Sequence, residues 1–203
     1  MKKGINFPIE KTMNHTEITR EETAEFLSKI LTIQSEILAN PTAETCSLYP
    51  SAEQAFNALS EALGFRGEPF SDIVFSEDFN RSFAKLFYGV GEKTFGLTHS
   101  FWTEGGLSSA GAGTGNAFAI YRKEGLGNAT SLPDDHLAVE LVFIAKLLSE
   151  NKIKEAVDFT VKEVLSWWPN ALLGILRASS SEDLNKFFKS VNSSLLMVSE
   201  LAD

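Results

Sequence analysis

Residues 132–148 read LPDDHLAVELVFIAKLL and contain the clearest helical pattern of the chain. Apolar side chains recur at positions 137, 141, 144 and 148, a spacing that places them on one face of an α-helix. Pro133 is suited to the first helical position, and Asp134 and Asp135 complement the positive end of the helix dipole. The stretch therefore predicts a helix that begins at Pro133 and buries one face.

Patterns of the same kind continue on both sides of this stretch. Thr19 and Glu22 form a capping box at the start of one helix, and Ser51 and Gln54 form another. Pro169 is expected to end a helix. No stretch alternates with the two-residue period of a strand, so the fold class is all-α. We expect a single compact domain of about seven to eight helices over residues 16–203, preceded by a flexible N-terminal arm over residues 1–15. The helices are predicted over residues 19–40, 51–63, 76–87, 116–123, 133–148, 153–168, 172–176 and 181–201.

The composition limits the class of protein. Of the 203 residues, 43% are hydrophobic and 22% are charged, which is ordinary for a globular protein. The formal net charge of −9 argues against a nucleic-acid partner and favours a cationic one. Cys46 is the only cysteine, which excludes an intramolecular disulfide. No window of 18 apolar residues could span a membrane, and the basic start lacks a signal peptide's apolar region, so we expect a cytoplasmic protein without stable membrane insertion.

A long glycine-rich loop is predicted over residues 89–115, which hold eight of the chain's 14 glycines. Loops of this length in compact domains are usually functional or disordered. The Gly111-x-Gly113-x-Gly115 run lacks the Gly-Lys-Ser/Thr ending of a phosphate-binding loop, and no strand precedes it. A nucleotide-binding protein that uses the Gly111–Gly115 loop is thus the less favoured alternative. No Gly-x-Ser-x-Gly motif is present, and we predict no enzyme.

His136 and Glu140 are four residues apart and share a helix face, which resembles half of a metal site. No further histidine is paired with them, so we favour a role in orienting or capping the helix start. The sequence predicts neither a metal nor a cofactor.

The residues from Leu132 to Phe143 resemble the signature of the TorD/DmsD family, which reads Glu-Pro-x-Asp-His followed by Glu-Leu and an aromatic residue. The segments 86–91, 100–107, 121–126 and 159–175 are similar to further family segments in the same order, and the resemblance covers about residues 83–177. Two departures stand out. Leu132 replaces the usual glutamate, and residues 96–99 replace the usual Pro-Pro-Trp.

The resemblance implies an all-helical, system-specific cytoplasmic chaperone of a molybdenum oxidoreductase. It implies that the chain binds the twin-arginine leader peptide of the precursor and delays export until the molybdopterin cofactor is inserted. The export translocase is a further implied partner, and the chain would be a monomer or a helix-swapped dimer. Carried over by position, with Glu140 added from its place on the helix face beside His136, the peptide and client site would comprise Leu86, Phe87, Trp102, Pro133, Asp135, His136 and Glu140.

The chemistry of such a leader agrees with these residue types. Guanidinium groups bind carboxylates through paired charge-assisted hydrogen bonds, and Asp134, Asp135, Glu140 and Glu104 are candidate acceptors. The apolar part of the leader needs an apolar groove, for which Phe87, Phe101 and Trp102 are candidates. The alternative in another class is a helical adaptor that binds a folded partner without recognising a leader.

Overall fold

The computed structural model describes residues 18–89, 94–105 and 112–202, and all regular secondary structure in these ranges is helical. Ten α-helices are present there, and two of them, α2 and α5, have only four and five residues. The eight longer helices agree with the prediction of about seven to eight, and the all-α class is confirmed. The predicted arm of residues 1–15 lies outside the described residues.

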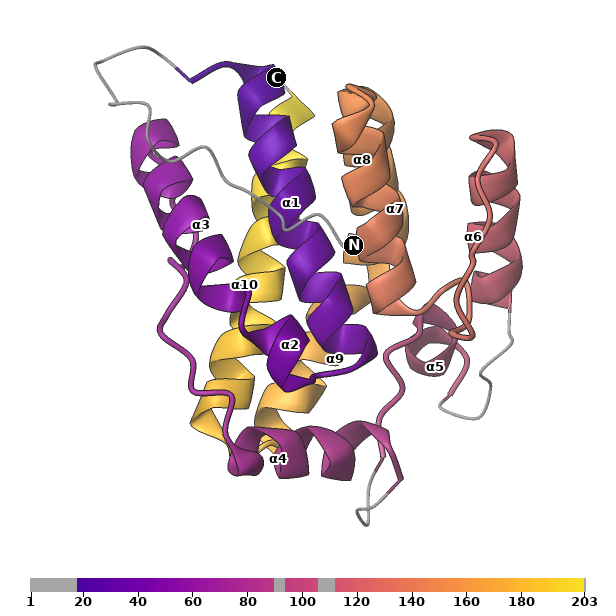
Figure 1. The fold of residues 1–203 in the computed structure, drawn as a ribbon. Coiled ribbons are helices and arrows are strands. Elements are labelled where there is room, and N and C mark those ends of the chain that lie inside the picture. Colours follow the sequence, from indigo (N-terminus) through magenta and orange to yellow (C-terminus); the bar gives the residue numbers. More distant parts are fainter. Residues whose placement is uncertain (1–17, 90–93, 106–111, 203) are drawn as a thin grey trace.

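The helices follow one another along the chain as shown in Figure 1. Their bounds are α1 Arg20–Ala39, α2 Ala43–Cys46, α3 Tyr49–Leu63, α4 Glu77–Phe87, α5 His99–Thr103, α6 Ala112–Lys123, α7 Leu137–Ser149, α8 Ile153–Phe159, α9 Leu165–Ala178 and α10 Glu182–Ser199. A π-helical turn, Thr160–Val164, joins α8 to α9, and a 3₁₀ turn, Glu200–Ala202, follows α10.

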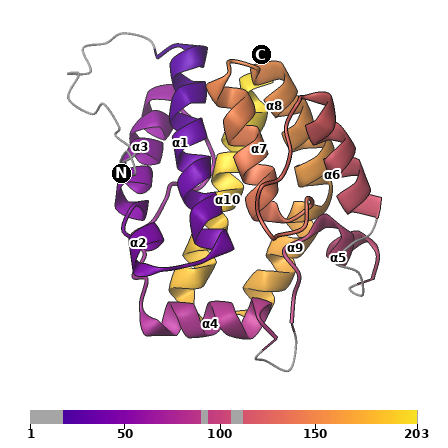
Figure 2. The ribbon, with the colours of Figure 1, turned by 45° about the vertical axis from the view of Figure 1, so that its right-hand side comes forward.

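The core lies between α1, α7 and α10, each of which buries an apolar face. Leu31 of α1 and Leu141 of α7 have no exposed surface. Burial of one such side chain stabilises the fold by about 1.5–3 kcal/mol. Helix α4 runs across one end of the bundle in both ribbon views (Figures 1 and 2). There its Phe79 packs edge to face against Phe187 of α10.

Some predicted helix starts are confirmed and others are wrong. The capping box of α1 is present, with Glu22 N–H donating to Thr19 Oγ1 over 3.1 Å and Thr19 N–H donating to Glu22 Oε2 over 3.0 Å. The predicted box at Ser51 is wrong. Helix α3 begins two residues earlier, at Tyr49, without a side-chain cap and with Pro50 in its first turn, where a proline needs no hydrogen-bond partner.

Pro169 does not end a helix, contrary to the prediction. It lies inside α9, which also contains the short helix predicted over residues 172–176. The preceding π-helical turn contains a bond from Leu165 N–H to Thr160 O, one residue longer than the α-helical bond. This wider turn lies just before the proline, where a regular helix would place its ring against the preceding turn.

The predicted glycine-rich loop is shorter than expected because it contains α5 and the start of α6. Helix α6 begins at Ala112 rather than at residue 116, so Gly113 and Gly115 are helical. Their helical backbone contradicts the phosphate-loop alternative for the described part of that run, and Gly111 lies outside it. In both ribbon views α6 lies at the edge of the bundle, beyond α7 (Figures 1 and 2).

Candidate functional site

Two segments meet beside the start of α7. The strip of residues 95–98 lies beside the turn of residues 133–136, and Thr98 and His136 form an isolated antiparallel bridge. Leu137 N–H donates to Leu97 O over 2.7 Å, and His99 N–H donates to Asp135 O over 3.0 Å. These bonds join two parts of the chain that are almost forty positions apart. They make the two segments one wall.

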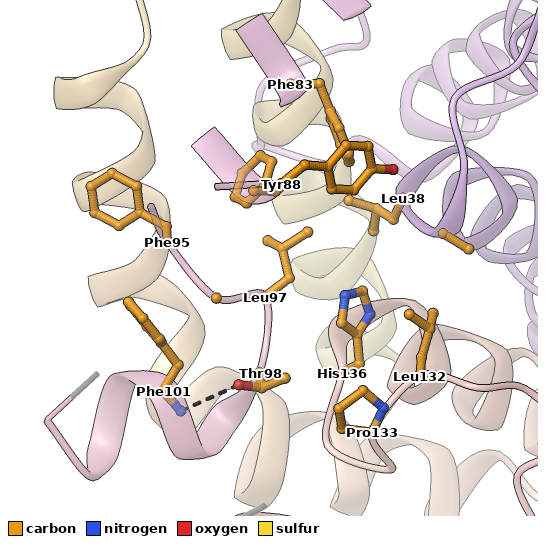
Figure 3. A pocket seen from close by; sticks show the side chains of 13 residues that line it. Leu38, Phe83, Tyr88, Phe95, Leu97, Thr98, Phe101, Leu132, Pro133 and His136 are labelled. Carbon is orange, nitrogen blue, oxygen red and sulfur yellow. Dashed lines mark hydrogen bonds between the residues drawn. The ribbon is translucent and has the colours of Figure 1, made fainter. Parts of the chain in front are cut away.

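This wall closes a pocket with a volume of about 450 Å³ (Figure 3). The size lies within the range of small-ligand pockets, about 300–1,000 Å³. Among the residues that the structure describes, no Lys, Arg, Asp or Glu side chain contributes to the lining, and most of the surface is aromatic or aliphatic. The lining residues are Leu38, Ala39, Phe83, Phe87, Tyr88, Phe95, Gly96, Leu97, Thr98, Phe101, Leu132, Pro133 and His136. Three of the predicted site residues, Phe87, Pro133 and His136, therefore come together.

His136 lines the pocket and also caps α7. Its Nδ1 accepts a hydrogen bond from Ala138 N–H over 3.2 Å. Burial lowers the pKa of His136 to about 4, and the nearby charge of Asp135 opposes this shift only in part. The imidazole is consequently neutral at pH 7, as the capping bond requires. Because His136 is the N-cap, the prediction that Pro133 opens the helix is wrong.

Asp135 is fully buried behind the wall and does not line the pocket. Its Oδ2 accepts hydrogen bonds from Ser100 N–H over 2.9 Å and from Ser100 Oγ over 2.5 Å. Its Oδ1 accepts a bond from Thr114 Oγ1 over 2.8 Å. Both carboxylate oxygens are thus engaged within the protein, and Asp135 is not exposed to an arginine of a partner in this structure.

Glu140 is also buried, with 1% of its surface exposed. Burial raises the pKa of Glu140 well above its ordinary value, and the charges of Asp135 and Glu163 raise it further, while Trp167 partly opposes the increase. Its Oε2 has no hydrogen-bond partner. Glu140 does not line the pocket, so a direct contact with a peptide is not seen for this residue either.

The comparison with known proteins identifies the family. A family profile described as "Nitrate reductase delta subunit" matches residues 47–172, which include α4, the strip and the start of α7. The chain belongs to this family. It is a family of TorD/NarJ-like chaperones and not of enzymes, which confirms the resemblance that the Asp-His motif carries.

A relative within this chaperone group is similar over a shorter range. "Chaperone protein TorD" of Actinobacillus succinogenes is 41% identical to the chain over 44 residues. That alignment covers 22% of this chain and 23% of the relative. No solved structure matches the chain.

Leu86 and Trp102, two further residues predicted from the chaperone motifs, lie near the pocket without lining it. Leu86 is buried, and its carbonyl accepts the Phe95 N–H over 2.7 Å, which anchors the start of the strip. The Trp102 indole N–H donates to Gly96 O over 2.8 Å, and its ring stacks on Phe95. The ring also lies against Gly174 of α9, where an added Cβ would be 2.5 Å from the ring.

The sequence reasoning missed several lining residues of this pocket. Leu38 and Ala39 come from the end of α1, far from the motif in sequence, and no local pattern signals their position. Tyr88 directly follows Phe87 and is 56% exposed. Its position within residues 86–91, which resemble a family segment, could have identified it as a site residue. Leu97 lies at a position where this chain departs from the family pattern.

Other features of the described residues offer no rival site. A second cavity of about 420 Å³ has a charged lining. Its lysines are already paired, Lys189 with Glu68 and Lys186 with Glu182. Within the described ranges no group of three or more His, Cys, Asp or Glu side chains could hold a metal ion. None of the helices there is long and apolar enough to cross a membrane.

Proposed function

We propose that this chain is a cytoplasmic maturation chaperone that binds the twin-arginine leader of a molybdenum oxidoreductase precursor, and that the pocket behind residues 95–98 receives the apolar part of that leader. The observation that carries the proposal is the pocket's position. Its wall contains Pro133 and His136 from the Asp-His motif, and Tyr88 lies on the opposite side (Figure 3). Tyr88 and Phe87, which also lines the pocket, come from another motif segment.

The lining suits an apolar segment and not a charged one. An uncharged pocket of aromatic and aliphatic side chains gains free energy by removing apolar surface from water, about 25 cal/mol per Å². A guanidinium group inside it would lose its hydration without gaining a carboxylate partner. We therefore assign the leucine-rich or aromatic stretch of the leader to the pocket and place the two arginines outside it.

The arginines need carboxylates with accessible oxygen atoms. Asp135 and Glu140 are buried, whereas Asp134 is partly exposed and Glu104 is exposed. Asp134 and Glu104 are thus the better candidates of the four considered. Each charge-assisted hydrogen bond to a guanidinium contributes about 1.5–3 kcal/mol. The net charge of −9 accelerates the encounter with a cationic leader.

Affinity capture from the native host, grown anaerobically, followed by mass spectrometry, tests the proposal. We expect one molybdoenzyme precursor with its leader uncleaved. Deletion of that leader should abolish capture, and replacement of its two arginines by lysines should weaken binding at least about tenfold, because lysine cannot form the paired bonds. Capture that survives deletion of the leader would instead favour an adaptor that binds a folded partner.

A further inference from the structure

The residues 133–136 have two functional sides. Pro133 and His136 line the pocket, whereas the residues between them hold α6. The backbone carbonyl of Asp134 accepts a hydrogen bond from the Tyr121 hydroxyl over 2.8 Å, and the Asp135 carboxylate accepts the bond from Thr114 Oγ1. Helix α6 is therefore attached, near its start and near its end, to the segment that forms the pocket wall.

The attachment at the start of α6 is closely packed. At Gly113 an added Cβ would lie 3.0 Å from Ser100 Oγ and 3.1 Å from Asp135 Oδ2. A side chain at this position would therefore force Ser100 or Asp135 to shift by a few tenths of an ångström. Ser100 at the start of α5 has no exposed surface. We call Ser100, Gly113, Thr114 and Asp135 the latch.

The latch residue Asp135 also lies at the two backbone hydrogen bonds that join the wall. The backbone of Asp135 accepts the His99 N–H, and Leu137, two residues further on, donates to Leu97 O. If the Asp135 side chain loses its partners, the backbone that pairs with residues 97–99 is no longer fixed from behind. Movement of this backbone changes the width of the pocket, although Ser100 and Thr114 do not line it.

We propose that Thr114 and Ser100 are positioning residues for client binding, which act through Asp135 by fixing the pocket wall to α5 and α6. The inference rests on the proposed function for its client, but the latch itself makes a prediction without one. Because coupling between sites is reciprocal, a leader in the pocket should in turn strengthen the attachment of α6.

The test uses three variants of the full chain. Thr114→Val removes the hydroxyl and keeps the shape, and Thr114→Ser keeps the hydroxyl. Thr32→Val is the matched control, since the Thr32 hydroxyl is also partly buried and donates over the same 2.8 Å, but to Ser28 O within α1. Amide hydrogen exchange at His99 and Leu137 is measured without client. Affinity is then measured for synthetic twin-arginine leader peptides of the host's molybdoenzymes.

We expect Thr114→Val to raise exchange at both amides at least tenfold and to weaken the best peptide at least fivefold. Thr114→Ser should remain within twofold of the parent in both measurements, as should Thr32→Val. Unchanged exchange in Thr114→Val overturns the latch, whether or not any peptide binds. Faster exchange with unchanged peptide affinity overturns the positioning role. Loss of the helical circular dichroism signal in Thr114→Val also overturns the positioning role, because the hydroxyl would then serve folding alone.

The two proposals fail in different ways. If no leader peptide binds the parent chain, the proposed function fails, and the exchange rates alone decide whether the latch fixes the wall. If the parent binds a peptide and Thr114→Val binds it equally well, the proposed function stands and the positioning role fails.

Discussion

Helices α1 and α7 pack against each other in the core. Helices α5 and α6 lie at the edge of the bundle, where a few hydrogen bonds and aromatic contacts hold them. Along α1 and α7 the contacts are mainly aliphatic, and Leu27, Ile30 and Ile144 have no exposed surface. Two buried serines of α1 also donate to backbone carbonyls of α7, Ser28 Oγ to Ala145 O and Ser35 Oγ to Ala138 O, each over 2.7 Å. Helix α6 buries Ala117 and Tyr121 but leaves half of Phe118 exposed. Its first turn depends on the hydrogen bond between Thr114 and a buried carboxylate.

The comparison separates stability from function. In the central pair apolar burial is spread over many side chains, and its two buried serine bonds join neutral hydroxyls to backbone carbonyls. A buried carboxylate, by contrast, is costly unless its partners are in place. The pocket lies where these two regions meet. The shape of the pocket therefore depends on these hydrogen bonds more than the stability of the fold does. The following experiments test that difference, beginning with the largest expected effect.

Truncation in the central pair should have the largest effect on stability. Leu141→Ala removes a fully buried side chain from α7 and should lower the free energy of unfolding by about 2–5 kcal/mol, because it leaves a cavity. Urea denaturation measures the change. Val142→Ala, one residue further along and 47% exposed, is the control and should change stability by about 0.5 kcal/mol or less. Equal losses in the two variants would contradict the assignment of the buried face.

His136 should make stability depend on pH. Because its pKa falls from 6.5 in the unfolded chain to about 4 in the fold, the unfolded state binds more protons between these values. The contribution of His136 to the free energy of unfolding is therefore complete above pH 6.5. It decreases as the pH falls towards 4, by on the order of 3 kcal/mol. The His136→Asn variant keeps a residue suited to capping but has no imidazole. Its free energy of unfolding should therefore not show this part of the decrease. Parallel stability curves for the parent and the variant would refute the lowered pKa.

Two glycines of α6 distinguish the latch from the rest of that helix. Gly115→Ala meets nothing within 4 Å and should stabilise the chain by about 0.5–1 kcal/mol through helix propensity. Gly113→Ala has the same gain but crowds Ser100 and Asp135, so it should be less stable than Gly115→Ala by about 1–3 kcal/mol. Thermal unfolding of both variants measures this. A Gly113→Ala variant as stable as Gly115→Ala would show that the close approach is absent.

Exposed aromatic side chains should have the smallest effect on stability. Tyr88 lines the pocket and is 56% exposed, and Phe118 on α6 is 50% exposed and lies outside the pocket. We expect each alanine variant to lose about 1 kcal/mol or less. Only Tyr88→Ala should weaken leader binding, which fluorescence anisotropy with a labelled leader peptide measures. A weaker complex with Phe118→Ala instead would move the client surface to α6.

The sequence predicted the elements that depend on local patterns. The capping box at Thr19 and the helix start at about Ser76 are present, because side chains three residues apart satisfy the free N–H groups of the first turn. It failed where tertiary contacts decide. Pro133 has the features of a helix start, but its carbonyl accepts the His136 N–H in a turn, and the helix begins only after the N-cap His136, where Asp135 and Leu137 bond to residues 99 and 97.

The candidate site was predicted in part for the same reason. The family motif indicated Phe87, Pro133 and His136, which line the pocket. The carboxyl groups of Asp135 and Glu140 were candidate acceptors for a guanidinium group, but both side chains are buried. Their burial depends on Ser100, Thr114 and Trp167, which lie in other parts of the chain. No local pattern reveals such partners.

The most direct test of the central claim is site-specific photo-crosslinking in the anaerobically grown host. Benzoylphenylalanine replaces Tyr88 in one version of the chain and Phe118 in the other, and mass spectrometry identifies the crosslinked peptides. The account predicts that position 88 captures the apolar stretch of a twin-arginine leader and that position 118 does not. Capture of the leader at position 118 alone, or of a folded partner at position 88 that persists without the leader, would contradict it.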